Sequence, residues 1–219
     1  IAAGEIIAES NGVALLASTP GIVHTINETS IGITTDFQRL DEPALALVQS
    51  TPLEPTLSKL QKLSAQAGIV GMGGAGYPSG QKLSSHIRHL IINGVECEPD
   101  IMSDAGLMIF EAQKILQGIG LLQAALPHLE SIKWAIEDDK PRAITAVQAA
   151  IRHENAAVEL VILETKYPAG GERQLVQQLH GFSLQPGEKS ALKGILCFNV
   201  GSIFALSQAY YEQQGLTKR

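Results

Sequence analysis

Apolar residues recur with two different periods along this chain, and the change of period divides it into two parts. In residues 1–40 apolar positions alternate with small or polar ones, and Gly and Asn separate the runs. This pattern is typical of short β-strands joined by turns. The connection over residues 38–55 is polar and carries three prolines, which interrupt any long helix. We therefore predict a small β module over residues 1–40 and a second domain over residues 55–219.

In the second part, segments with helical periodicity alternate with short apolar runs. The predicted helices cover residues 56–66, 102–126, 141–151, 172–180 and 202–213. The predicted strands cover residues 89–93, 132–136, 158–164 and 194–199. The longest helix is expected to break near Gly118 and Gly120, because glycine is a poor helix former. Alternation of strands and helices predicts an α/β fold, a Rossmann-like three-layer sandwich with a parallel sheet, whose ligands bind at the carboxyl ends of the strands.

The composition is that of a globular protein, with 45% apolar and 17% charged residues. A net charge of −6 argues against nucleic acid as a partner, since nucleic acid requires a basic face. Apolar runs are too short to cross a bilayer. The chain begins with Ile and shows no leader pattern, so we expect it to be a piece of a longer protein.

Metal chemistry is not predicted. Cys97 and Cys197 stand far apart and form no C-x-x-C motif, which argues against an iron–sulfur or zinc site within these residues. His86 and His89 are three residues apart and could share a helix face, but no third ligand is near. A reduced, cytosolic environment is the default for so few cysteines.

A glycine-rich stretch is the first candidate for ligand binding. It reads Gly71-Met-Gly-Gly-Ala-Gly-Tyr-Pro-Ser-Gly-Gln-Lys82, so Gly73, Gly74 and Gly76 also lack side chains. Bare backbone amides can approach an anion, and a helix that starts at the proline would turn its N-terminus towards a phosphate, with Lys82 beside it. The Gly-x-Gly-x-x-Gly spacing is a weak dinucleotide signal, because a helix rather than a strand is predicted before it. The alternative is a plain turn between two elements.

Acidic residues follow the first strand of the second part. Asn93, Glu96 and Glu98 lie in one loop, and the two glutamates fall roughly 20 residues beyond Gly76, the spacing at which an acid meets ribose in nucleotide-binding folds. Such a cluster can bind ribose hydroxyls or the nicotinamide amide, or hold a cation. A solvated acidic loop is the alternative.

Two further loops lie at the same expected edge of the sheet. Gly170 and Gly171 precede a helix that begins at Glu172, a second anion-friendly helix start, which suggests one elongated ligand or two ligands side by side. Tyr167 could stack on a flat ring or cover the edge of the core. Asn199 could hydrogen-bond a ring amide or a ribitol, or cap the last helix.

The first two strand phrases, Gly-Glu-Ile-Ile-Ala-Glu and Ser-Thr-Pro-Gly-Ile-Val-His-Thr-Ile, resemble the flattened β-barrel of biotin- and lipoyl-carrier domains. Carrier domains attach their group to a lysine in a turn between or near these strands. The first lysine of this chain is Lys59. The resemblance therefore implies a partial barrel-sandwich hybrid of structural character rather than an acyl carrier.

Taken together, the loops at the strand ends resemble the C subunit of electron transport complexes of the Rnf type. This family is related to the FMN-bearing, NADH-oxidising subunit of respiratory complex I, and the match runs in order along nearly the whole chain. It rests on the glycine-rich stretch, Asn-Gly-Val-Glu-Cys-Glu-Pro, Ile-Glu-Asp-Asp-Lys-Pro, Lys-Tyr-Pro-Ala-Gly-Gly-Glu-Arg-Gln-Leu and Asn-Val-Gly. Two positions depart from the complex I motif, with Val95 in place of an aspartate and Cys97 in place of a serine.

The resemblance implies FMN and NADH as cofactors, and no catalytic side chain, because the flavin carries the chemistry. Gly71, Gly73 and Lys82 would hold FMN, and Glu98 would lie on the nicotinamide side. The positions implied in binding are Gly71, Gly73, Gly74, Gly76, Lys82, Asn93, Glu96, Glu98, Tyr167, Gly170, Gly171, Glu172 and Asn199.

The implied function is NADH oxidation through FMN within a membrane-associated electron transport complex. Electrons would pass to iron–sulfur centres, which in the family lie C-terminal to the matching segment, and then to a ferredoxin-like partner. The implied location is peripheral, on the cytoplasmic side of the bacterial inner membrane, in contact with other subunits. Two alternatives remain: a cobalamin reductase-like flavoprotein of a microcompartment, and a non-catalytic scaffold.

Overall fold

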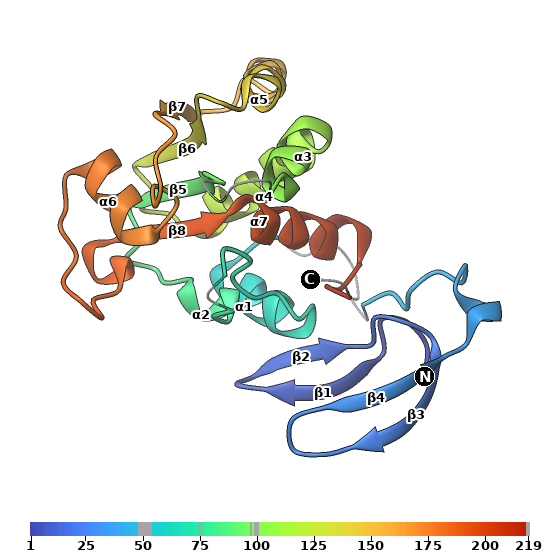
Figure 1. The fold of residues 1–219 in the computed structure, drawn as a ribbon. Helices are drawn as coiled ribbons and strands as arrows, with labels where there is room; N and C mark the ends of the chain where they lie inside the picture. Colours follow the sequence, from blue (N-terminus) through green and yellow to red (C-terminus); the bar gives the residue numbers. More distant parts are fainter. Residues whose placement is uncertain (48–53, 75, 97, 99–100, 218–219) are drawn as a thin grey trace.

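The computed structural model describes residues 1–47, 54–74, 76–96, 98 and 101–217 (Figure 1). Its N-terminal residues form two β-hairpins, and these lie beside an α/β domain that begins with the helix at Leu57. The structure thus changes from all-β to α/β as the apolar period of the sequence changes.

A four-stranded parallel sheet forms the centre of the α/β domain. Its strands are β5 (His89–Gly94), β6 (Ser131–Glu137), β7 (Glu159–Leu163) and β8 (Ile195–Asn199). They lie in the order β7-β6-β5-β8, and each neighbouring pair is parallel. β5 is buried on both faces, as its continuous apolar run predicts. The predicted strands and the parallel sheet are confirmed.

The order of the strands reverses beside β5. The chain moves outwards from β5 to β6 and β7 and then returns to place β8 on the other side of β5. The connections on either side of such a switch point leave in opposite directions and open a crevice at the carboxyl ends of the strands. A ligand site is therefore expected between the ends of β5 and β8.

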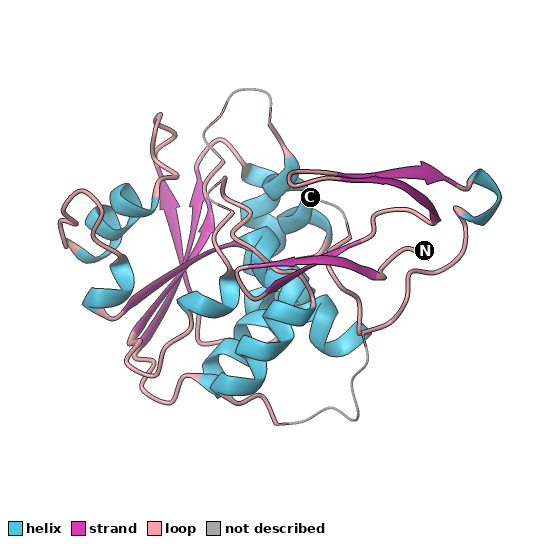
Figure 2. Ribbon diagram, turned by 90° about the horizontal axis from the view of Figure 1, so that it is seen from below, coloured by secondary structure: helices cyan, strands magenta, loops and turns pink. Residues whose placement is uncertain are grey.

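Helices cover both faces of the sheet, as Figure 2 shows from below. The apolar core of one face is shared by α1 (Leu57–Gln66), α3 (Ser103–Phe110), α4 (Ala112–Ala125), α5 (Pro141–His153) and α7 (Val200–Ser207). On the other face α6 (Glu172–His180) buries Leu175 and Val176 in one cluster with Ile91 and Cys197 of the sheet. The result is the predicted three-layer arrangement.

The break in the helix predicted over residues 102–126 does not lie at its glycines. The chain leaves helical geometry at Glu111, between α3 and α4, whereas α4 continues unbroken through Gly118 and Gly120. A β-carbon at Gly118 would lie 2.5 Å from the backbone oxygen of Ile203 in α7. Glycine at this position therefore permits close packing of two helices rather than ending one.

The last helix also differs from the prediction of residues 202–213. Asn199 caps α7 through its side chain, so the helix already begins at Val200. It then widens into a π-helical turn at Gln208–Glu212. The closing segment is thus helical as predicted, with an earlier start and an irregular end.

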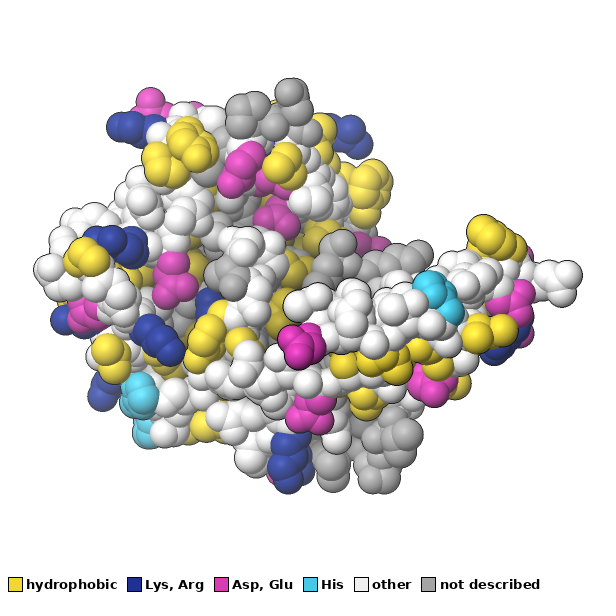
Figure 3. Space-filling view, turned by 60° about the horizontal axis from the view of Figure 1, so that its bottom comes forward, with side chains coloured by type: hydrophobic (Ala, Val, Ile, Leu, Met, Phe, Trp, Pro, Cys, Tyr) yellow, Lys and Arg dark blue, Asp and Glu magenta, His cyan; other side chains and the backbone are white. Residues whose placement is uncertain are grey.

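The N-terminal strands are β1 (Ile6–Ser10), β2 (Val13–Leu16), β3 (Gly21–Ile26) and β4 (Ile31–Thr35). They pair as two separate antiparallel hairpins, β1 with β2 and β3 with β4, so the barrel suggested by the sequence is not confirmed. Ile22, Ile26 and Phe37 are each at least 74% exposed. Hydrophobic side chains accordingly line the protruding N-terminal part in Figure 3.

None of the helices among the described residues is both long enough and apolar enough to pass through a bilayer.

Candidate functional site

A cavity of about 380 Å³ opens at the switch point, where the carboxyl ends of β5 and β8 meet. This volume lies in the usual range for small-molecule sites. Nine of the residues selected from the sequence line it: Gly73, Gly74, Asn93, Glu96, Glu98, Tyr167, Gly170, Gly171 and Asn199. The three loops that the sequence places at this edge therefore do converge with the glycine-rich stretch.

The glycine-rich stretch is a closed loop that holds its own ends together. The amide of Gly71 donates to the oxygen of Tyr77 at 2.8 Å, and the amide of Gly76 donates to the oxygen of Gly71 at 3.1 Å. The amide of Met72 donates to Ser202 Oγ at 3.0 Å, which anchors the loop to α7. Gly71 and Gly76 therefore shape the loop and do not line the cavity.

The tip of this loop presents backbone to the cavity. Gly74 has a φ of +92°, which residues with a side chain rarely adopt. A β-carbon added at Gly73 would lie 3.7 Å from the β-carbon of Asn199. Within the described residues, the amides of Gly73 and Gly74 donate to no protein group. The helix that follows, α2 (Ser79–Lys82), has only four residues. Glycine amides, rather than a helix N-terminus, are thus the groups available to an anion.

Asn93 ties two walls of the cavity together. Its Nδ2 donates to the backbone oxygen of Gly170 at 2.9 Å, and its Oδ1 accepts from the amide of Val95 at 3.0 Å. The residue is 9% exposed. Its amide is therefore committed first to the protein, and it positions the loop around Gly170.

Glu96 serves the N-terminus of α3. Its Oε1 accepts from Ser103 Oγ at 2.9 Å and from the amide of Asp104 at 3.0 Å, while its Oε2 accepts from the amide of Ala105 at 3.1 Å. A carboxylate at a helix N-terminus satisfies amides that the helix leaves unpaired. The sequence marked Glu96 as a ligand contact, yet both of its oxygens are engaged in capping α3.

Behind Glu96 lies a second acid that the sequence did not single out. Glu137, at the end of β6, is completely buried and accepts from the amide of Glu96 at 3.1 Å. Burial raises its pKa, and Lys140, whose Nζ lies 3.9 Å from Oε2, partly opposes that rise. Glu137 thus fixes the backbone from which Glu96 reaches α3.

Asp104 is the cavity residue that sequence reasoning missed. Asn199 accepts from the amide of Gly201 at 2.8 Å through Oδ1, and its Nδ2 donates to Asp104 Oδ2 at 2.5 Å. The pKa of Asp104 is raised to about 6, mainly by burial; the bond from Asn199 lowers the pKa, and the nearby charges of Glu96 and Glu98 add to the increase. An acid in the first turn of a helix at this sheet edge was the available sequence signal.

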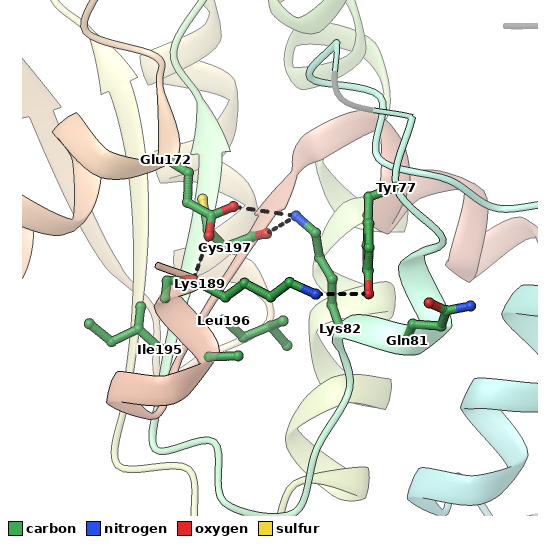
Figure 4. Close-up of a pocket in the computed structure, with 10 residues that line it drawn as sticks. Tyr77, Gln81, Lys82, Glu172, Lys189, Ile195, Leu196 and Cys197 are labelled. Carbon is green, nitrogen blue, oxygen red and sulfur yellow. Dashed lines mark hydrogen bonds and ion pairs between the residues drawn. The ribbon is translucent and has the colours of Figure 1, made fainter. Parts of the chain in front are cut away.

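Lys82 and Glu172 lie in a second, smaller pocket of about 200 Å³ (Figure 4). Lys82 Nζ is 3.4 Å from Glu172 Oε2 and donates to the backbone oxygen of Cys197 at 3.3 Å. Glu172 Oε1 accepts from Ser190 Oγ at 2.6 Å. Glu172 directly follows Gly171 of the cavity lining, so the two pockets are neighbours along α6.

An aromatic ring and a second lysine complete this pocket. Lys189 Nζ donates to the hydroxyl of Tyr77 at 3.2 Å and lies 4.8 Å from the centre of its ring, as Figure 4 shows. Cys197 also lines the pocket, but burial raises the pKa of its thiol to about 12, which keeps it protonated. The pocket thus offers a flat ring and two cations.

Some predicted positions contribute less than expected. Tyr167 is 73% exposed at the rim of the cavity, so a ring resting on it would remain open to solvent. Glu98 is exposed at the same rim. Cys97, one of the two positions that depart from the complex I motif, lies outside the described residues.

The carboxyl of Asp104 makes folding stability depend on pH. Its pKa of about 6 in the folded protein exceeds the ordinary value of 3.8. The loss of folding stability caused by the ionised carboxyl is thus absent below pH 4, grows as pH rises towards 6 and is then constant. We expect Asp104→Asn to raise the free energy of unfolding by about 1–2 kcal/mol at pH 7.5, with no gain at pH 4. Denaturant unfolding at the two pH values measures this difference.

The exposed acid Asp41 provides the control for this measurement. Asp41→Asn should leave the free energy of unfolding nearly unchanged at both pH values. A stabilisation by Asp104→Asn that is equal at pH 4 and pH 7.5 would contradict the charge argument.

Comparison with known proteins places this geometry in context. The family model described as the Nuo51 FMN-binding domain matches residues 64–208. A protein of Haemophilus influenzae (strain ATCC 51907 / DSM 11121 / KW20 / Rd), named as the C subunit of an ion-translocating oxidoreductase complex, is 35% identical over 231 residues, covering 99% of this chain and 28% of that protein. A protein of the same name from Pectobacterium atrosepticum is 42% identical over 157 residues, covering 70% of this chain and 22% of that protein. The chain thus spans less than a third of these two relatives.

Solved structures share the fold. The crystal structure of an NAD⁺-reducing [NiFe]-hydrogenase in the air-oxidized state superposes with a TM-score of 0.58 at 20% identity, over 73% of this chain and 31% of that one. The same enzyme in the H₂-reduced state gives a TM-score of 0.57 at 19% identity, over 74% of this chain and 32% of that one. At these identities the likeness is one of fold.

Proposed function

The chain belongs to the Nuo51 FMN-binding domain family, and from this premise we propose that it is the flavin- and NADH-binding part of an ion-translocating oxidoreductase complex. Its relatives of 35–42% identity carry the name of that complex's C subunit, as the sequence resemblance implied. Because these relatives are several times longer, the activity of the whole protein remains part of the proposal.

The observation that carries the proposal is the cavity at the switch point of the sheet. FMN has an anionic phosphate, a polyhydroxyl chain and a flat ring, and the cavity has counterparts for the first two. The amides of Gly73 and Gly74 can donate hydrogen bonds to a phosphate at close range, because no β-carbon stands in the way. Carboxylate oxygens at the acidic end can accept hydrogen bonds from hydroxyls. The residues present therefore fit FMN.

The second pocket supports NADH as the other ligand. NADH carries a pyrophosphate between two nucleosides, and the pocket combines the ring of Tyr77 with the ammonium groups of Lys82 and Lys189. An aromatic face suits a base, and the cations suit the pyrophosphate. Because the pocket adjoins the flavin cavity at Gly171 and Glu172, one NADH molecule could reach from it towards the ring.

The chain itself supplies position and charge rather than a reacting side chain. FMN, when bound, supplies the ability to take a hydride from NADH and to give up electrons singly. Asn93, Glu96 and Asn199 hold the cavity walls in place through bonds to the protein. We further propose that in the complete protein the electrons continue to iron–sulfur centres and a ferredoxin-like partner, on the cytoplasmic side of the membrane.

Reconstitution with FMN tests the proposal. The purified protein is incubated with FMN, excess flavin is removed, and the visible spectrum is recorded before and after anaerobic addition of NADH. We expect the flavin to be retained and its absorbance to bleach with NADH. A protein that retains no flavin would support the scaffold alternative and contradict the proposal.

Two glycine variants make the test specific. Gly74→Asp places a negative side chain at the proposed phosphate contact and should abolish flavin retention. Gly12→Asp is the matched control, since Gly12 also has a positive φ, +71°, and open space around it, but lies in the first hairpin. Both variants carry similar backbone strain. Equal flavin content in the two variants would refute the assignment of the phosphate to the glycine loop.

A further inference from the structure

The polar groups of the flavin cavity differ in how much hydrogen-bonding capacity they have left for a ligand. In Asn93, Glu96 and Asn199, both terminal polar atoms of the side chain are hydrogen-bonded to the protein. Asp104 is different, because its only side-chain hydrogen bond among the described residues is the one that Oδ2 accepts from Asn199. Its second oxygen, Oδ1, is left as an acceptor in the cavity lining.

The surroundings of Asp104 do not stabilise its charge. The titratable groups that face it are Glu96, on the loop after β5, and Glu98 at the rim, and both are acids. From β8 it meets only the neutral amide of Asn199. No lysine or arginine among the described residues pairs with it. A half-buried carboxylate without a cation lowers stability, and residues kept at such a cost are characteristic of functional sites.

We propose that Asp104 is a ligand-contacting residue, whose Oδ1 accepts a hydrogen bond from a hydroxyl or ring N–H of the bound flavin. This contact places the non-phosphate part of the flavin at the Asp104 end of the cavity. This inference rests on the proposed function. The phosphate is kept away from the same end, because a carboxylate repels it, and is directed to the glycine amides. Asp104 thus sets the orientation of the flavin as well as part of its affinity.

Affinity for three flavins tests this contact. FMN, riboflavin, which lacks the phosphate, and lumiflavin, which lacks the polyhydroxyl chain, are titrated into the wild type, Asp104→Asn and Asp41→Asn. Asn at position 104 keeps the shape and can still accept from Asn199, but it loses the charge. We expect Asp104→Asn to weaken FMN and riboflavin by about tenfold to a hundredfold alike. Asp41→Asn removes the same charge from an exposed residue that does not line the cavity, and should change both affinities by less than about threefold.

The three probes give separate outcomes. An equal loss for lumiflavin assigns the contact to a ring N–H, and an unchanged lumiflavin affinity assigns it to a hydroxyl. If Asp104→Asn binds FMN as tightly as the wild type, or more tightly while riboflavin is unaffected, the contact is overturned. If the wild type binds none of the three flavins, both the proposed function and this contact are contradicted. If the wild type binds FMN but Asp104→Asn binds it equally well, only the contact is contradicted.

A pH profile provides a readout that a purely structural role would not change. Riboflavin is the probe here, because the phosphate of FMN itself titrates near pH 6. In the wild type, riboflavin affinity should fall as pH drops from 7 to 5, since protonation removes the acceptor charge of Asp104. The profile of Asp104→Asn should be flat, and that of the control Asp41→Asn should still fall. A wild-type profile that matches Asp104→Asn would overturn the proposal.

Discussion

Replacement of Glu96 by alanine is expected to lower the free energy of unfolding by about 3 kcal/mol and to abolish flavin retention. Three donors, two backbone amides and the hydroxyl of Ser103, lose their acceptor, and the N-terminus of α3 loses its negative charge. Asp104 is carried on that first turn, so the acidic end of the cavity loses its geometry as well. Denaturant unfolding and the flavin content after reconstitution measure the two effects.

Two further variants separate capping from charge. Glu98→Ala removes the neighbouring acid, which is exposed and accepts no side-chain or backbone bond within the described residues, and should change stability by less than about 0.5 kcal/mol. Glu96→Gln keeps one acceptor oxygen and should lie between the wild type and Glu96→Ala. If Glu96→Ala is as stable as Glu98→Ala, the capping role of Glu96 is wrong.

Lys82→Glu should reduce kcat/KM for NADH by about a hundredfold while flavin content stays near that of the wild type. The substitution removes one of the two cations of the second pocket and sets a carboxylate against Glu172, 3.4 Å from the present position of the ammonium group. The new carboxylate repels both Glu172 and the pyrophosphate of NADH. The site is half-buried, so these charges are screened less than in water. Steady-state kinetics with a soluble electron acceptor measures the effect.

Lys193→Glu is the matched control for this charge change. Lys193 pairs with Glu188 on an exposed part of the same side of the domain and lines neither pocket. Its replacement should leave kcat/KM for NADH within about threefold of the wild type. Loss of flavin from Lys82→Glu, in place of loss of NADH affinity, would contradict the second-pocket assignment and would restore the contact with the FMN phosphate that the sequence resemblance implied.

The sequence predicted the elements of the sheet well because each strand is a short apolar run between polar turns. Asn93 and Glu96 could be selected because they lie at and just after the end of a strand, but their bonds to the protein depend on neighbours that only the fold supplies. Asp104 reaches Asn199 across 95 positions of sequence. Its place in the first turn of a predicted helix was visible in the sequence, but no local pattern encodes its contact with Asn199.

The two glycine positions judged to be helix breaks illustrate the same limit. Propensity disfavours glycine within a helix and therefore predicted a break in α4, but α4 is unbroken. Gly118 nevertheless lies within the helix, because the backbone of Ile203 occupies the space that a side chain would need. Lys82 was likewise assigned by its place after the glycine loop, whereas the short α2 carries it into the second pocket.

The position of β8 beside β5 has a consequence for biosynthesis. Asn199, which lines the cavity, ends the last strand of the domain, and Ser202 in the helix that follows accepts a hydrogen bond from the amide of Met72 across 130 residues of chain. The ribosome must therefore have produced almost the entire domain before Ser202 is present to anchor the glycine loop. Contacts between such distant segments form late during folding. If the cavity holds the proposed flavin, insertion must follow the synthesis of β8, and nascent chains that stop before β8 should not capture the cofactor.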